Sequence, residues 1–289
     1  MPYIYLITSV FMSASSSVFG KIFNKKNDEK KDASIFYNFL LMISVFIGWG
    51  ILYIIDFSFD VNVLWYSALF AVFYTACNLG IINALKYGPA MLTSLFIGLS
   101  LLLTTIWGFI FWNAKITIPV VIGLILVICA IVLCLYTKEK DEKNISLKWL
   151  FYIALAFFGN AGCSIVQRTQ QMQYEGQYGN MLMLFAMGLS ALAYLIIYLR
   201  SNKEDTPIMF KKSWWLPVFA GVCNLILNVF VMLMAVTDLS PSLIYPVIGV
   251  GGLAVVTIFS LLVFKEKMRW WQWLGVAVGA VAVLLLSIG

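Results

Sequence analysis

The sequence predicts an all-α polytopic membrane protein with ten transmembrane helices in two inverted five-helix repeats. Three observations predict this fold class. Apolar residues make up 62% of the 289 residues and charged residues only 11%, which leaves too little polar surface for a soluble domain. Charged residues divide the chain into ten uncharged runs, each long enough to cross a bilayer. Features of the first half recur in the second half in the same order.

The first five runs predict the helices of a first repeat, residues 1–137. A helix needs about 20 apolar residues to cross the hydrocarbon layer. The first run has no positively charged segment before it, so we expect a membrane helix there and not a cleaved signal peptide. The five runs cover residues 1–20, 33–55, 61–85, 87–114 and 116–137.

A charged segment at residues 138–147 is expected to be a cytoplasmic linker to the second repeat, residues 148–289. Charged segments are usually solvated, and we expect the same of residues 24–33 and 201–212. Spanning segments must satisfy their own backbone amides, and these runs lack the period-two alternation of barrel strands, so they predict helices. The five runs of the second repeat cover residues 149–167, 176–199, 213–237, 239–264 and 270–289.

The distribution of basic residues predicts the orientation. Of the 19 Lys and Arg residues, 17 fall in loops on one side of the predicted bundle, and only Lys115 and Arg168 fall in loops on the other. The positive-inside rule then predicts a multi-pass protein of the cell membrane with both termini outside. Tryptophans near the predicted helix ends support the spans, because indole rings prefer the membrane interface; they are Trp65, Trp112, Trp149, Trp214, Trp215, Trp270, Trp271 and Trp273.

The repeat indicates how the halves are related. With an offset of 152 residues, Pro89 falls on Pro241 and Gly123 on Gly275. The first helices of the two halves also correspond, with Ser16–Lys21 over Cys163–Arg168 at a different offset. An odd number of helices in each half forces the second half to insert upside down relative to the first. Inverted halves are typical of secondary transporters, in which they exchange conformations around a site near the membrane centre.

The end of the chain carries a family pattern. Phe264 and Glu266 are followed by a polar turn and by a helix with Gly275 and Gly279. This pattern resembles the close of an EamA-type repeat of the drug/metabolite transporter superfamily. The first half departs from it, because Ala114 stands where Glu266 stands in the second half.

Two further segments resemble the passage from helix 3 to helix 4 of the same repeat, Ala84–Gly108 and Asp238–Val256. The resemblance implies a family of exporters, importers and exchangers for metabolites, amino acids and cationic drugs. Ten-helix members of that family are usually described with both ends in the cytoplasm, opposite to the orientation that the basic residues predict.

The candidate binding residues are uncharged. All charged residues are expected at or near helix ends, so we expect no membrane-embedded carboxylate that would couple transport to protons. Buried amides and hydroxyls need partners in lipid, and they therefore face the interior of a bundle. Helical spacing places several of them on shared faces. The substrate-binding candidates are Ser13, Ser16, Ser17, Asn38, Tyr74, Asn78, Asn160, Ser164, Asn224, Asn228 and Tyr245.

Structural roles are open alternatives for these residues. Stripes of Ser and Gly commonly form tight helix–helix contacts, and the pair Asn224 and Asn228 suits interhelical hydrogen bonds as well as a cavity wall. Trp49 and Trp107 lie further inside their runs, as packing residues or as cavity walls. Pro246, among several glycines, predicts a kinked or discontinuous helix, a feature that tends to lie beside binding sites.

Together these patterns favour a transporter for a small neutral or zwitterionic metabolite, such as an amino acid, working by alternating access. The alternatives are efflux of cationic drugs, with Trp49, Trp107 and Tyr74 in cation–π contacts, and a non-transporting scaffold or sensor. The absence of histidine and of paired carboxylates argues against an enzyme. We expect no cofactor, no metal site, free cysteines, no nucleic-acid partner, and a monomer or homodimer in the lipid bilayer.

Overall fold

The computed structural model describes residues 2–27, 30–87, 90–135, 146–264 and 270–288. Most of the predicted linker, residues 138–145, therefore lies outside the described residues. The described part of the chain is helical. Its helices are α1 (Pro2–Lys26), α2 (Ala33–Ile55), α3 (Val63–Tyr87), α4 (Ala90–Phe111), α5 (Ile118–Leu135), α6 (Leu147–Gln173), α7 (Gly179–Arg200), α8 (Thr206–Ser213), α9 (Trp215–Ala235), α10 (Pro241–Phe264) and α11 (Trp270–Ile288).

The long helices are suited to a bilayer. Six of them, within the described residues, are long and apolar enough to cross a membrane: α1, α2, α3, α6, α7 and α9. The other long helices, α4, α5, α10 and α11, contain shorter apolar stretches. Large apolar side chains such as Ile51, Ile110, Leu192 and Leu284 point outward, where lipid would cover them. The protein is an all-α, multi-pass membrane protein.

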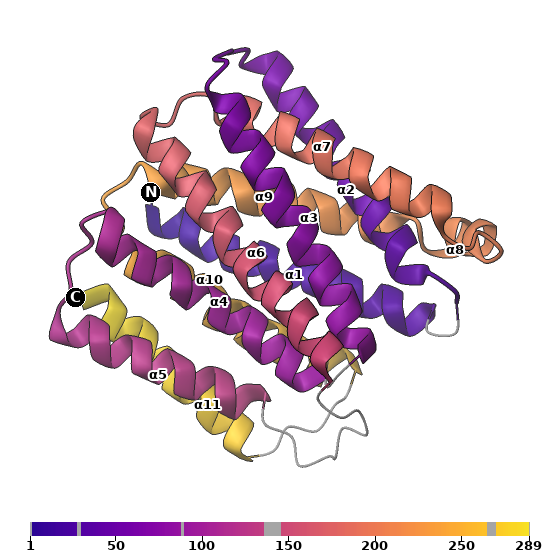
Figure 1. Cartoon of the computed structure of the whole chain (residues 1–289). Coiled ribbons are helices and arrows are strands. Elements are labelled where there is room, and N and C mark those ends of the chain that lie inside the picture. Colours follow the sequence, from indigo (N-terminus) through magenta and orange to yellow (C-terminus); the bar gives the residue numbers. More distant parts are fainter. Residues whose placement is uncertain (1, 28–29, 88–89, 136–145, 265–269, 289) are drawn as a thin grey trace.

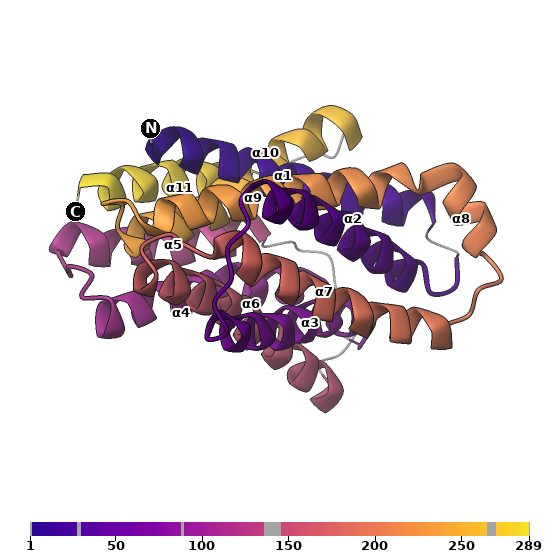
Figure 2. The same cartoon turned by 90° about the horizontal axis from the view of Figure 1, so that it is seen from above.

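The helices form two layers, which Figure 2 shows from above. In one layer the order is α10, α1, α9 and α2, and in the other it is α4, α6, α3 and α7. The layers meet where α2 packs on α7 and where α10 packs on α4, and the pair α5 and α11 closes one side of the molecule (Figure 1). Each layer thus combines two helices from each half of the chain.

The packing has a pseudo-twofold pattern. Helix α1 packs on α9 and α10 of the second half, and helix α6 packs on α3 and α4 of the first half. Exchanging the halves therefore exchanges the two layers. Both chain termini lie at one end of the bundle, called here the terminal end (Figure 1). The segments from α1 to α2 and from α7 to α9, which carry most of the described Lys and Arg residues, lie at the opposite end (Figure 1).

Helix α6 differs from its prediction in a way that matters for the site. Ser146 caps its N-terminus, where its hydroxyl accepts a hydrogen bond of 3.1 Å from the Trp149 amide. The helix then continues past residue 167 to Gln173. Arg168, expected in a loop, is therefore a helical residue with only 5% of its surface exposed. The expectation of a loop is wrong at this position, and Arg168 lies within about two turns of the helix end.

The expected connector at residues 201–212 contains a short helix, α8, and is not solvated along its whole length, since Met209 is buried against α1 and α2. An ion pair of 3.1 Å joins Lys30, between α1 and α2, to Asp205, just before α8. The hydrogen bond from Lys30 lowers the pKa of Asp205 below its usual value, and the Lys31 amide adds to this effect. A second pair joins Lys31 to Glu204 at 3.2 Å.

Glycine sets the distance between α3 and α6. A Cβ atom at Gly80 would lie 2.6 Å from the Ala156 nitrogen, and one at Gly159 would lie 2.7 Å from the Phe73 carbonyl oxygen. The two backbones therefore approach closely, as small residues permit in membrane bundles. Helix α10 runs without interruption through Pro246, so the alternative of a discontinuous helix is not observed.

Candidate functional site

A cavity of about 550 Å³ lies between the two layers, walled by α1, α9 and α10 on one side and by α3, α4 and α6 on the other. Helices of both halves therefore build it. Every candidate residue from the sequence except Asn38 lines this cavity. Those residues are Ser13, Ser16, Ser17, Tyr74, Asn78, Asn160, Ser164, Asn224, Asn228 and Tyr245.

Amide side chains form a hydrogen-bond chain across the cavity wall. The Gln167 amide on α6 donates to the side-chain oxygen of Asn228 on α9 at 3.3 Å. Asn228 donates to the side-chain oxygen of Asn224 at 3.1 Å, and the Tyr74 hydroxyl on α3 donates to the same oxygen at 3.4 Å. The chain joins α3, α6 and α9 through uncharged groups. Several of these bonds are long, which leaves the amides available to a solute.

A second polar group lies where α4, α6 and α10 meet. The Asn160 amide donates to the Ser100 hydroxyl at 2.7 Å and so joins α6 to α4. The Tyr245 hydroxyl on α10 donates to the backbone oxygen of Ser164 at 3.4 Å. The Ser164 hydroxyl in turn donates to the carbonyl oxygen of Asn160, which lies one turn earlier on α6. Each wall of the cavity thus presents donors and acceptors without a formal charge.

The serines of α1, Ser13, Ser16 and Ser17, form another part of the cavity wall. The Ser17 hydroxyl bonds the Ser13 carbonyl oxygen at 3.1 Å, within the helix. Gly252 of α10 lies opposite, with 3.5 Å between a Cβ built there and the Ser13 hydroxyl. This stripe of serines is therefore both a cavity wall and a close helix contact.

Asn38 lies outside this cavity. It is 9% exposed, and its amide donates to the Ser34 carbonyl oxygen one turn earlier on α2. Trp49 and Trp107 do not line the cavity either. Trp49 is buried and borders a separate hollow at the terminal end, and Trp107 stacks on Phe111 with ring centroids 4.1 Å apart.

Sequence reasoning missed the apolar part of the wall. Phe70, Cys77, Cys163, Leu227 and Ile248 line the cavity between the polar groups. Helical spacing could have found two of them, because Cys77 lies three residues after Tyr74 and Cys163 three residues after Asn160. The described cysteines Cys77, Cys129, Cys163 and Cys223 are free, as expected, and Cys129 lies exposed on α5. Within the described residues, no three His, Cys, Asp or Glu side chains gather where they could hold a metal ion.

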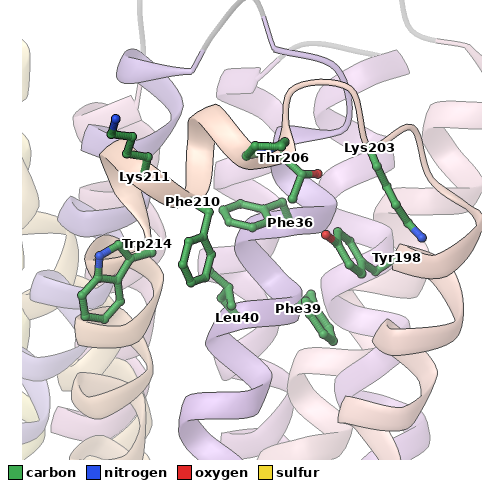
Figure 3. Close-up of a pocket in the computed structure, with 10 residues that line it drawn as sticks. Phe36, Phe39, Leu40, Tyr198, Lys203, Thr206, Phe210, Lys211 and Trp214 are labelled. Atoms are coloured by element: carbon green, nitrogen blue, oxygen red, sulfur yellow. The ribbon is translucent and has the colours of Figure 1, made fainter.

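A second cavity, of about 730 Å³, lies at the opposite end of the bundle between α2, α7 and α8 (Figure 3). Its wall is mainly aromatic, with Phe36, Phe39, Phe210 and Trp214, and with lysines at its edge. It lies at the edge of the bundle, and no residue of α3, α6, α9 or α10 lines it. Because it lies at one end of the bundle, away from the central helices, it is poorly placed to be exposed to the two sides in turn.

Comparisons with known proteins agree with this architecture. The model of the EamA-like transporter family matches residues 1–136 and 147–288, so nearly the whole chain is covered by two copies. No curated protein matches the sequence significantly. A solved structure described only as a crystal structure of a protein has a TM-score of 0.75 and 14% identity, covering 99% of this chain and 96% of that one. At this identity the likeness shows the fold alone.

Proposed function

The chain belongs to the EamA-like transporter family and is a membrane transporter, and we propose that it carries a small neutral or zwitterionic metabolite, such as an amino acid. In this proposal the solute binds in the cavity between the two layers. Transport is secondary and proceeds by alternating access, in which the layers rock about the bound solute.

One observation carries the proposal, namely that both halves of the chain contribute uncharged polar groups to a single central cavity. Its volume of about 550 Å³ falls within the usual range for small-molecule sites. None of the lining residues is charged. Amides such as Asn224, Asn228 and Gln167 offer both donors and acceptors, which suits a solute with an ammonium and a carboxylate or with neutral polar groups.

The packing pattern supports the mechanism. Helices α1 and α6 hold equivalent positions, each in contact with two helices of the other half. A small rotation of one layer against the other would close the cavity on one side and open it on the other, and the pseudo-twofold relation makes the two end states similar in structure. Proteins of this design can therefore alternate without large local refolding.

Efflux of cationic drugs is less well supported. That alternative relied on Trp49 and Trp107 for cation–π contacts, and neither ring lines the cavity. Of the three rings on which this alternative relied, Tyr74 alone lines the cavity. No acidic side chain among the lining residues would attract a cation.

Flux measurements in proteoliposomes test the proposal. The purified protein would be reconstituted and assayed with radiolabelled amino acids and related metabolites, with protein-free liposomes as the blank. We expect saturable uptake of at least one zwitterion, weakened in an Asn228→Ala variant and retained in Asn38→Ala, which changes the same side chain outside the cavity. Absence of saturable flux for every compound would count against the proposal.

A further inference from the structure

Arg168 carries the one buried charge among the residues that the structure describes. It lies in the last third of α6, toward the terminal end, with 5% of its surface exposed. A charge inside a membrane helix is costly, and such residues normally pair with an opposite charge or serve a function. The surroundings of Arg168 therefore decide which of these applies.

The guanidinium is only partly satisfied by the protein. Its Nη2 atom donates to the Leu239 carbonyl oxygen at 3.3 Å, and the group lies 5.4 Å from the centre of the Trp112 ring. Its Nε and Nη1 atoms are buried and have no hydrogen-bond partner. The ion pairs of the described residues involve other side chains, so no carboxylate there neutralises Arg168. Two donors thus lack a partner, and the positive charge is offset by neutral groups alone, namely the Leu239 carbonyl oxygen, the Trp112 ring and the nearby Tyr245 phenol.

Arg168 adjoins the central cavity. Ser164, one turn earlier on α6, and Gln167, its neighbour in the chain, both line the cavity. Tyr245 of α10 also lines it, bonds the Ser164 carbonyl oxygen, and has its phenol group beside the guanidinium. Tyr245 thus connects the guanidinium to the cavity wall. A positive charge in this low-dielectric surrounding acts on a solute over several ångströms.

We propose that Arg168 selects solutes by charge, and that the transported solute carries an anionic group, a carboxylate in an amino-acid-like molecule. The inference rests on the transport function proposed above and narrows it. The unpaired Nε and Nη1 atoms of Arg168 can each donate a charge-assisted hydrogen bond to a carboxylate oxygen. The charge of Arg168 repels a solute that is only cationic, because no acidic residue lines the cavity to offset that charge.

One experiment tests the charge without any knowledge of the solute. A Ser164→Cys substitution, in a background with the native cysteines replaced by alanine, places a thiol in the cavity. Its rates of reaction with anionic (2-sulfonatoethyl) methanethiosulfonate and with the cationic trimethylammonium-ethyl reagent would be compared, each divided by the rate with a free thiol. We expect R168Q to lower the anionic-to-cationic ratio about tenfold, which is the effect of a modest change in potential.

Arg200→Gln is the matched control, because it removes the same charge from an exposed position at the end of α7. It should leave the ratio unchanged. An equal ratio with and without the R168Q change would overturn the proposal. So would a thiol that reacts with neither reagent, because charged solutes would then not reach the cavity. Size-exclusion profiles identify the variants that fold. If R168Q does not fold, R168K serves instead, because it keeps the charge and must therefore keep the anionic-to-cationic rate ratio.

A second measurement separates this inference from the proposed function. In proteoliposomes, amino acids would compete for uptake against their amides, which lack the carboxylate. We expect the amino acids to compete at least about tenfold better in the wild type, and R168Q to remove the preference. Saturable uptake with equal competition by amides would overturn the charge selection and leave the transport function standing. Absence of saturable uptake would remove the transport function, while the thiol experiment would still measure the charge.

Discussion

Helices α1 and α6 hold equivalent places in the two halves, but they are built differently. Helix α6 meets α3 through Gly80 and Gly159, with backbone against backbone. Helix α1 meets α9 through rings, with Tyr5 stacked on Phe230 at 5.2 Å and Phe19 on Phe219 at 6.0 Å. Close backbones can hardly slide without a clash, whereas ring contacts can repack. The comparison indicates that the α3–α6 contact is the rigid one and the α1–α9 contact the adaptable one.

The chemistry of the two helices differs in the same direction. Helix α6 presents Asn160, Ser164 and Gln167 to the cavity and holds the buried Arg168, whereas α1 presents serines. In the repeat, Lys21 of α1 corresponds to Arg168 of α6. Lys21 is half-buried near the opposite end, so the two related cations differ in burial. The rigid helix thus carries most of the polar recognition groups, which favours a fixed geometry of the site.

The largest expected effect breaks the rigid contact. Gly159→Ala places a Cβ atom against backbone atoms of α3, and we expect a loss of about 1–3 kcal/mol of stability or more, from overpacking. Gly50→Ala is the matched control, because its Cβ atom would meet only Leu184 at 3.8 Å. Thermal unfolding in detergent measures both. Equal melting temperatures for the two variants would contradict a close α3–α6 contact.

A smaller effect is expected at the adaptable contact. Phe230→Leu keeps an apolar side chain but removes the stacking on Tyr5, which should cost about 0.5–1.5 kcal/mol. The same unfolding assay applies. If this variant lost more stability than Gly159→Ala, the assignment of the rigid and the adaptable contact would have to be reversed.

Because Asn160 of α6 bonds another helix and Ser17 of α1 bonds its own, we expect a polar substitution in α6 to cost more stability than one in α1. Asn160→Ala removes a 2.7 Å bond between α6 and α4, and interhelical hydrogen bonds in membranes contribute on average about 0.6 kcal/mol. Ser17→Ala removes a bond within α1, and we expect a smaller change there. Unfolding in detergent and uptake in proteoliposomes would be compared for the pair. Greater damage from the serine variant would show that α1 holds more of the site than its bonds indicate.

The smallest effect concerns the loops that follow the two helices. The Lys30–Asp205 ion pair joins the loop after α1 to the segment before α8, whereas a neutral bond from Tyr66 of α3 holds Gln173 at the end of α6. The pKa of Asp205 is lowered in the folded protein, so this pair stabilises it above the pKa of the unfolded chain. The contribution is lost as the pH falls through the folded-state pKa. We expect Asp205→Asn to be slightly less stable than wild type at neutral pH, with the difference vanishing in acid.

Much of the fold could be predicted because lipid imposes simple rules on composition. Uncharged length gave every long helix, and helical spacing brought Asn224 with Asn228, and Asn160 with Ser164, to one cavity. The end of α6 could not be placed because charge served as the sign of a loop. Arg168 escaped that rule, since the ring of Trp112 and the carbonyl oxygen of Leu239 support its charge from distant segments.

Other features also depended on contacts that sequence does not show. Asn38 was selected by residue type, yet its amide donates to the Ser34 carbonyl oxygen and it does not line the cavity. The short helix α8 was hidden in a charged segment, because its stability depends on burying Met209 against α1 and α2. The glycines of α3 and α6 could be seen in the sequence, but which helices they join could not.

The exchange of packing partners between the halves also bears on how the protein is made. Helix α1 leaves the ribosome before the other described helices, but its main partner α9 begins only at Trp215. Its contact with the next helix, α2, is slight by comparison. During synthesis α1 must therefore wait in the lipid as a single span until most of the chain has been inserted. The final assembly step is then the return of α9 and α10 to the first helix, and a chain cut within the second half would leave α1 without a place to pack.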